Sequence, residues 1–530
     1  MLKDKKLMQA ISNILRRSEK QPEVEGLLKT YVEVGVLPQM HNKNNQILLG
    51  RRGTGKTHVL RVLGEQENSS VVTYIDLRML GSAQEFTNLS RPMTQRCTNL
   101  FKDFLLEIYN SLLEVVTSTE NQGAISTNVH QKLEEFEEAI THVASKHSKA
   151  ELTKEKATES SNTFGSGINF TPNSLGGQIG QNSARQSSDK ITSVVEQVFE
   201  DSLIFAQVTR SLEGAIKSSG RDGLFLLINE WPSLPLDIQP YFAEFIKRVF
   251  LLSAKSTVKI ASLEYRSQFF QQLTNNNVLG FELGSDIFVD LELDDYFVYD
   301  RNPEEVTKTF EELLYKHIDN GVSGNFLASE LDISTSKELK RRLFTSRNAF
   351  VELVRAAEGV ARDFINIFTA AYFDAHRKGQ ENIGIPDIRN AAKTWYEKDK
   401  ESNLQNCQQQ FLHSVVGSVI RGKKARSFLL QRDQARNALI RSLFDYRVLH
   451  LMQKGYSDPS NPGIRYDIYT LDYGTYVDLI NTQSQPDLGL ELQVDNQDHD
   501  RVVPFDDKRS IRSIILPREL LERFDNCIGS

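Results

Sequence analysis

The octapeptide Gly50-Arg51-Arg52-Gly53-Thr54-Gly55-Lys56-Thr57 matches the phosphate-binding pattern G-x-x-x-x-G-K-[S/T] at every fixed position. The apolar run at residues 46–49 is too short for a helix and predicts a strand, whereas residues 58–63 continue with helical spacing. A glycine-rich turn between strand and helix directs backbone N–H groups and the positive helix end toward phosphates. The motif therefore predicts a nucleoside triphosphate site in an α/β fold with a parallel sheet.

The last two positions of the loop have separate expected roles. Lys56 is expected to reach the β- and γ-phosphates, and the Thr57 hydroxyl to bind Mg²⁺. ATP and Mg²⁺ are therefore the predicted cofactors, and the alternative is a glycine turn that binds nothing. The residues predicted to contact the nucleotide are Gly50, Arg51, Arg52, Gly53, Thr54, Gly55, Lys56, Thr57 and His58.

A second buried strand is predicted at residues 224–228, five large apolar residues followed by Asn229 and Glu230. In P-loop ATPases such a strand usually ends in Asp-Glu, the Asp holding the Mg²⁺ shell and the Glu orienting the attacking water. Glu230 is therefore the predicted catalytic base. Asn229 can bind a magnesium-bound water but brings no charge, which predicts slow turnover or a nucleotide-dependent switch. The alternative is a buried strand with an incidental polar end.

Length and composition restrict the class of protein further. A chain of 530 residues exceeds one hydrophobic core, so two to four domains are expected. No apolar run approaches the ~20 residues that cross a bilayer, and no apolar export signal follows the first residues. The three cysteines, Cys97, Cys407 and Cys527, are too dispersed for a disulfide framework or a metal cluster, so a cytoplasmic protein without membrane attachment is expected.

Together these motifs resemble an AAA+ ATPase of the origin-recognition type, in particular bacterial relatives of replication initiators. The resemblance implies a parallel sheet flanked by helices, an all-α lid and a C-terminal winged helix. It also implies that Arg362 contacts the γ-phosphate from the lid, with a lid arginine in a local ion pair as the alternative. The motifs that carry it are the phosphate loop, residues 229–235, the helix at 239–246 and Gly359-Val360-Ala361-Arg362-Asp363.

The same resemblance suggests sensors in the run at residues 256–266, which resembles the next core strand. Ser262 and Glu264 are the candidate γ-phosphate sensors. Arg266 stands beyond the strand, where such proteins carry a cation that touches a neighbour's nucleotide. A structural arginine is the alternative for Arg266.

The pattern along the chain predicts four parts. Residues 1–298 form the ATP-binding core, with a polar, glycine-rich insertion near 145–189 that is either a linker or a partner-binding loop. Residues 299–405 form the helical lid and 406–483 the winged-helix domain. Residues 484–530 form an acidic tail and a terminal helix.

The winged-helix prediction also suggests a partner. Between residues 421 and 447 the basic side chains exceed the acidic ones by six, and Arg432, Arg436 and Arg441 are the predicted DNA-binding residues on or next to one recognition helix. The wing has no basic residue between 457 and 463, so docking of a protein is the alternative.

Two functions follow from these expectations. The first is an ATP-dependent DNA-binding or assembly switch, in which ATP closes the core on the lid and DNA complexes or homo-oligomers form. The second is a signalling or scaffold ATPase of a bacterial antiviral defence or mobile-element system, which recruits an effector or accessory protein. A nucleotide kinase, the third class, would not need Arg362 or the winged helix.

Overall fold

The computed structural model describes residues 1–15, 20–21, 24–81, 88, 90–120, 128–141, 203–274, 277–322, 326–421, 425–457, 462–479 and 514–524. The polar insertion predicted near 145–189 and most of the acidic tail lie outside these residues, so the structure does not bear on them.

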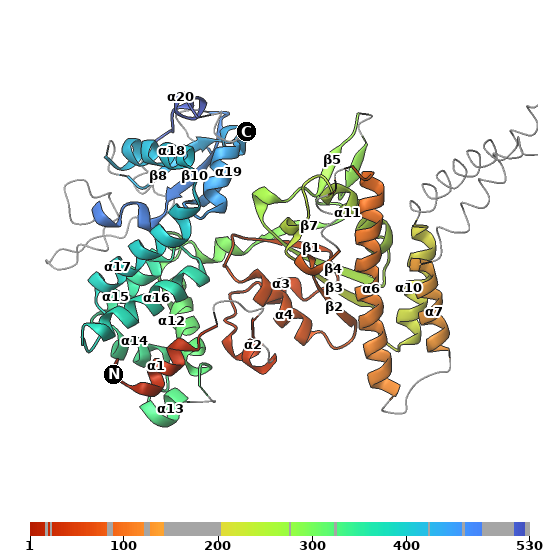
Figure 1. Cartoon of the computed structure of the whole chain (residues 1–530), viewed down its shortest axis with the longest axis horizontal. Coiled ribbons are helices and arrows are strands. Elements are labelled where there is room, and N and C mark those ends of the chain that lie inside the picture. Colours follow the sequence, from red (N-terminus) through yellow and green to blue (C-terminus); the bar gives the residue numbers. More distant parts are fainter. Residues whose placement is uncertain are drawn as a thin grey trace, which may run out of the picture.

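A five-stranded parallel sheet forms the centre of the N-terminal core (residues 1–298), in the order β2-β3-β4-β1-β7 (Figure 1). Strand β3 is buried along its whole length, which explains its continuous apolar sequence. Strand β4 is equally buried but carries Lys259 and hydroxyl side chains among its apolar residues. The strands are β1 (Gln46–Leu49), β2 (Val71–Asp76), β3 (Leu224–Asn229), β4 (Ser256–Ser262) and β7 (Phe288–Glu292). The predicted α/β class, with a parallel sheet flanked by helices, is confirmed.

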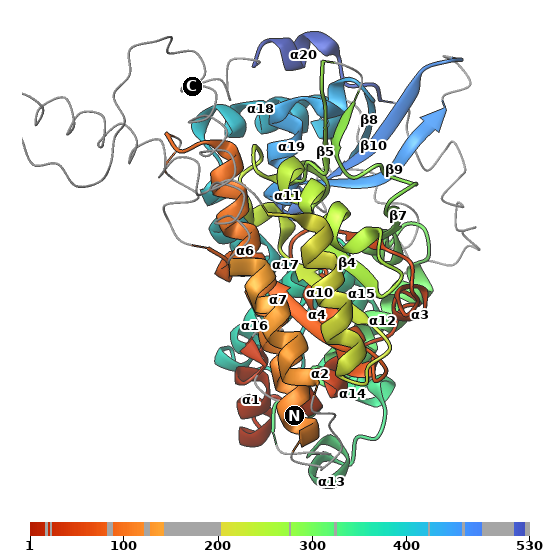
Figure 2. The same ribbon diagram turned by 90° about the vertical axis from the view of Figure 1, so that its right-hand side faces the viewer.

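Helices cover both faces of this sheet. On one face the long helix α6 places Phe101 and Phe104 against Phe242 and Phe250, and α7 and α10 pack alongside (Figure 2). The other face carries α4, which follows the phosphate loop. The helices of the core are α1 (Lys5–Ser12), α2 (Val24–Thr30), α3 (Leu37–Met40), α4 (Lys56–Gln66), α6 (Met93–Glu120), α7 (Val129–Thr141), α10 (Phe205–Ser218) and α11 (Gln239–Ile246); β5 (Phe270–Gln272) and β6 (Val278–Gly280) form a hairpin.

The next part of the chain is helical. Its first helix begins at Pro303, where the Asn302 side chain accepts a hydrogen bond from the Glu305 backbone N–H and caps the helix. The helices of this lid are α12 (Pro303–Asp319), α13 (Phe326–Leu331), α14 (Ser336–Leu343), α15 (Arg347–Ala356), α16 (Ala361–Arg377) and α17 (Ile385–Trp395).

The C-terminal module joins helices to a three-stranded antiparallel sheet in the order β8-β10-β9. Its elements are α18 (Asn406–Val416), β8 (Ser427–Gln431), α19 (Ala438–Asp445), β9 (Leu449–Ser457), β10 (Arg465–Leu471) and α20 (Arg518–Glu522).

The prediction of one helix through Arg436 and Arg441 is wrong. Arg436 ends a short 3₁₀ turn, and α19 starts two residues later. The interruption is Asn437, whose backbone is extended (ψ 135°) and whose side chain accepts a hydrogen bond from the Leu439 N–H at 2.8 Å. The cap at Asn437 therefore separates the 3₁₀ turn that contains Arg436 from the helix that contains Arg441.

The lid and the C-terminal module share one apolar core. Tyr396, Phe411, Phe444 and Tyr473 belong to a single cluster that continues to the α4 face of the central sheet. The modules therefore pack as a unit with the N-terminal core.

Two further observations concern the class of protein. Cys97 is a buried free thiol, and Cys407 is disulfide-bonded. Among the described residues, no helix combines the length and hydropathy needed to span a bilayer.

Candidate nucleotide site

The phosphate loop joins β1 to the N-terminus of α4. Gly53 and Gly55 have φ angles of 90° and 109°, which are accessible to glycine and strained for other residues, and α4 begins at Lys56. The Lys56 ammonium donates hydrogen bonds to the carbonyls of Gly50 and Arg51 at 2.8 and 2.9 Å. Burial lowers the pKa of Lys56 to about 8, so the side chain stays mostly protonated at pH 7. The turn thus holds a cation at a helix N-terminus, as an anion site requires.

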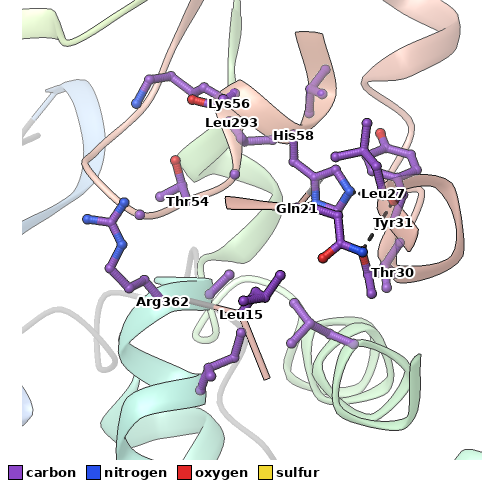
Figure 3. A pocket seen from close by; sticks show the side chains of 18 of the residues that line it. Leu15, Gln21, Leu27, Thr30, Tyr31, Thr54, Lys56, His58, Leu293 and Arg362 are labelled. Atoms are coloured by element: carbon purple, nitrogen blue, oxygen red, sulfur yellow. Dashed lines mark hydrogen bonds between the residues drawn. The ribbon is translucent and has the colours of Figure 1, made fainter. Parts of the chain in front are cut away.

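A cavity of about 880 Å³ opens in front of this loop. Figure 3 shows Lys56, Thr54 and Arg362 toward one end and Leu27, Tyr31 and His58 toward the other. The rings of Tyr31 and His58 meet edge to face, with their centroids 5.3 Å apart. One end therefore suits phosphates and the other suits a flat apolar group, and the volume lies within the range of small-molecule sites.

The lid reaches this cavity through Arg362 at the start of α16. Its backbone N–H donates to the Gly53 carbonyl at 3.1 Å, and a Cβ at Gly53 would lie 2.8 Å from the Arg362 Cβ. Glycine is therefore required at position 53 for two reasons, the backbone conformation and the approach of the lid.

Two oxygen-bearing side chains lie together beside the loop. The Thr57 hydroxyl donates to the Asn229 Oδ1 at 3.1 Å, and Asn229 is 1% exposed at the end of β3. Hydroxyl and amide oxygens suit Mg²⁺, which takes few protein ligands and keeps several waters. Within the described part of the chain, no three His, Cys, Asp or Glu side chains form a metal cluster. The residues present fit a nucleotide-borne Mg²⁺ rather than a protein-only metal centre.

Glu230 follows directly and lines the cavity. Its φ of 58° is unusual for a residue other than glycine, and such strain concentrates at functional sites.

The two candidate sensors point in different directions. Ser262 lines the cavity, is 1% exposed and bonds to the hydroxyl of Ser267. Glu264 instead pairs with Lys454 of β9 at 2.7 Å, and burial raises its pKa. Ser262 is therefore the candidate that the fold leaves beside the nucleotide.

Arg266 contacts the C-terminal module of its own chain. Its guanidinium pairs with Asp445, the last residue of α19, at 2.5 Å. The cation considered for a neighbouring subunit's nucleotide is thus held within the chain.

The two arginines of the phosphate loop differ in the direction of their side chains. Arg52 is exposed and lines the cavity, whereas Arg51 is 5% exposed and bonds away from it. Arg51 binds Asp294 at 2.9 Å, the Glu358 carbonyl at 3.0 Å and the His450 Nδ1. The Arg51 backbone N–H also donates to Asp294, at 2.8 Å, so neither the side chain nor the N–H of Arg51 is directed at the cavity.

His450 extends this contact into a buried charge cluster. It bonds Asp472 at 2.8 Å, and Asp472 pairs at 2.5 Å with Lys400, which also pairs with Asp363 at 3.0 Å. Burial and Arg51 lower the pKa of His450 to about 4, so it is neutral at pH 7. The cluster connects the phosphate loop, the C-terminal module and the residue after Arg362.

The predicted DNA-binding arginines are not equivalent. Arg432 and Arg436 are exposed. Arg441 is only partly exposed, and its guanidinium lies 5.7 Å from the ring centroid of Tyr265 in the core. Arg441 therefore faces the N-terminal core.

Sequence reasoning missed Asp294, His450 and Asp76. Asp76 ends β2 next to Asn229, and its position after an apolar strand was the available signal. Asp294 and His450 follow no comparable local pattern.

No protein-family model and no curated protein matches the chain. Among solved structures, the crystal structure of Cdc6p from Pyrobaculum aerophilum aligns over 88% of this chain and 95% of that chain, with 12% identity and a TM-score of 0.30. A likeness at this level does not assign a function, so the assignment depends on the geometry of the chain itself.

Proposed function

We propose that this chain binds ATP with Mg²⁺ in the 880 Å³ cavity and hydrolyses it slowly, as an AAA+ type switch. The observation that carries the proposal is the phosphate loop at the start of α4, with Lys56 inside it and the lid bonded to Gly53 through Arg362. Bound phosphates would meet Lys56 on one side and the lid arginine on the other.

The roles of the remaining side chains follow from their positions. Mg²⁺, when bound with the nucleotide, would offset the charge of its phosphates. Thr57 and Asn229 would hold it, and Glu230, which also lines the cavity, would accept a proton from the attacking water. Because Asn229 is uncharged, we expect slow turnover.

We further propose that the C-terminal module is a winged helix that binds DNA in response to nucleotide. The support is its antiparallel sheet with α19 between β8 and β9, and the exposed Arg432 and Arg436. The cluster from Arg51 to Asp472 gives a physical route from the phosphate loop to β9 and β10. Arg266 would serve a neighbouring subunit only after leaving Asp445.

Titration with a fluorescent ATP analogue tests the central claim. Lys56→Ala should lose nucleotide affinity, because it removes the buried cation of the loop. Lys337→Ala, at an exposed position on α14, is the matched control and should bind as the parent does. Equal affinities in the parent and Lys56→Ala would contradict the assignment.

A further inference from the structure

The uncharged Asn229 has a carboxylate directly behind it. Asp76 ends β2 in register with Asn229 of β3, and the Asn229 Nδ2 donates to the Asp76 Oδ2 at 3.2 Å. Asn229 lines the cavity. Asp76 does not line it, and the Asp76 side chain is 11% exposed. The negative charge absent from position 229 is thus present one side chain further from the cavity.

This pair fixes the direction of the Asn229 amide. An ionised carboxylate only accepts hydrogen bonds, so Asp76 takes the NH₂ group and leaves the carbonyl oxygen toward Thr57. That oxygen accepts from the Thr57 hydroxyl at 3.1 Å. A reversed amide would set its oxygen against a carboxylate and its NH₂ against the metal position.

We propose that Asp76 is a positioning residue for the Mg²⁺ site. Its carboxylate holds the Asn229 oxygen toward the metal and supplies the negative charge that Asn229 lacks. The proposal rests on the nucleotide site described above. A carboxylate behind a metal ligand orients that ligand and raises its affinity for the cation. Asn229 would supply the oxygen ligand and Asp76 the negative charge, which a single carboxylate at position 229 would otherwise supply together.

Arg78 suggests a different role for the Asp76 carboxylate. Its backbone N–H, Nε and Nη2 all bond to Asp76, at 3.1, 2.8 and 2.5 Å, and Arg78 lines the cavity. Asp76 would then only hold a phosphate-binding cation in place. The two explanations differ in what each substitution does with and without Mg²⁺.

The test measures affinity for a slowly hydrolysed ATP analogue in Mg²⁺ and in EDTA. The ratio of the two affinities isolates the metal contribution. Asp76→Asn should lower this ratio by about 10-fold or more, the usual loss when an outer partner of a metal ligand is removed, and leave the EDTA affinity unchanged. The exchange variant Asp76→Asn/Asn229→Asp, which moves the carboxylate to position 229, should restore the ratio.

Arg78→Gln separates the alternatives and also serves if Asp76→Asn fails to fold. Arg78 is 39% exposed, and its loss frees the Asp76 carboxylate, so the ratio should stay at the parental value or rise. A parental ratio in Asp76→Asn, or loss of the ratio in Arg78→Gln, overturns the proposal. Failure of the nucleotide assignment is distinct, because the EDTA affinity would then be absent or insensitive to Lys56→Ala.

Discussion

Lys400 is the central cation of a buried cluster, and its replacement should be costly. Its side chain is 1% exposed and pairs with Asp363 at 3.0 Å and Asp472 at 2.5 Å, which are 0% and 2% exposed. Lys400→Met keeps the length and removes the charge. Asp363 keeps Arg447, whereas Asp472 keeps only neutral His450 among these neighbours.

The magnitude follows from the two carboxylates. Breaking a buried pair on one side costs about 3–5 kcal/mol, because the remaining charge is left desolvated. Burial raises the pKa of Asp472, but Lys400 and His450 bring it from 3.8 down to about 2, a shift worth about 2 kcal/mol. Since Arg447 still serves Asp363, we expect the lower end of the range, about 3 kcal/mol.

The pH dependence has a definite sign. Because the folded pKa of Asp472 is lowered, its stabilisation is present above pH 4 and is lost as the pH falls toward 2. The stability difference between the parent and Lys400→Met should therefore shrink over that interval.

Urea unfolding and hydrogen exchange of β9 and β10 would measure the effect. Lys337→Met, at an exposed position, is the control for loss of a lysine. Exchange in β9 should rise in Lys400→Met and reach the phosphate loop through the Arg51 contact with His450. An unchanged urea midpoint and unchanged exchange in β9 would refute the reasoning.

Three further outcomes are expected. Glu230→Gln should reduce ATP hydrolysis by about 10²-fold or more with little change in nucleotide affinity, because it removes only the proton acceptor; a parental rate would exclude Glu230 as the base. Gly53→Ala should weaken ATP-analogue binding and raise hydrogen exchange at the start of α16, since its Cβ would lie 2.8 Å from that of Arg362. Asp445→Ala should raise exchange in α19 and, by releasing Arg266, increase ATP-dependent self-association in light scattering; no change in either would leave the ion pair without a regulatory role.

Local patterns predicted the core of the fold because its elements are locally encoded. The runs at 46–49 and 224–228 became β1 and β3, since a buried parallel strand needs only a short apolar run between turns. The phosphate loop likewise carries its geometry in its glycines. Asn229 and Ser262 both line the cavity because they end β3 and β4, and the carboxyl ends of parallel strands share one edge of the sheet; Thr57 reaches Asn229 from the start of α4.

Local sequence patterns do not predict the contacts between the C-terminal module and the core. Arg51 and His450 are 399 positions apart, and Glu264 and Lys454 are 190 apart, so no local period relates them. The sequence does not predict these pairs because the partner of each charge comes from another module. A charged residue in a motif predicts a binding role only when tertiary structure leaves it unpaired.

The basic excess at residues 421–447 gives the clearest case. Arg426 pairs with Asp300 and Glu358, Arg447 with Asp363 and Asp399, and Arg441 stacks on Tyr265. Among the side chains that the structure describes in this stretch, Arg432 and Arg436 remain exposed, and Arg421, Lys423 and Lys424 lie outside that set.

If six basic side chains, the whole local excess, contacted DNA phosphates, log affinity would fall with log salt at a slope of about −5. Contacts from the two exposed arginines, Arg432 and Arg436, contribute only about −2 to that slope. Measured with ATP over several salt concentrations, Arg432→Ala/Arg436→Ala should flatten the slope by about two, and adding Arg441→Ala should change it no further. A comparable flattening by Arg441→Ala alone would mean that α19 leaves Tyr265 to bind DNA. A parental slope in the double variant would favour a protein partner for this surface.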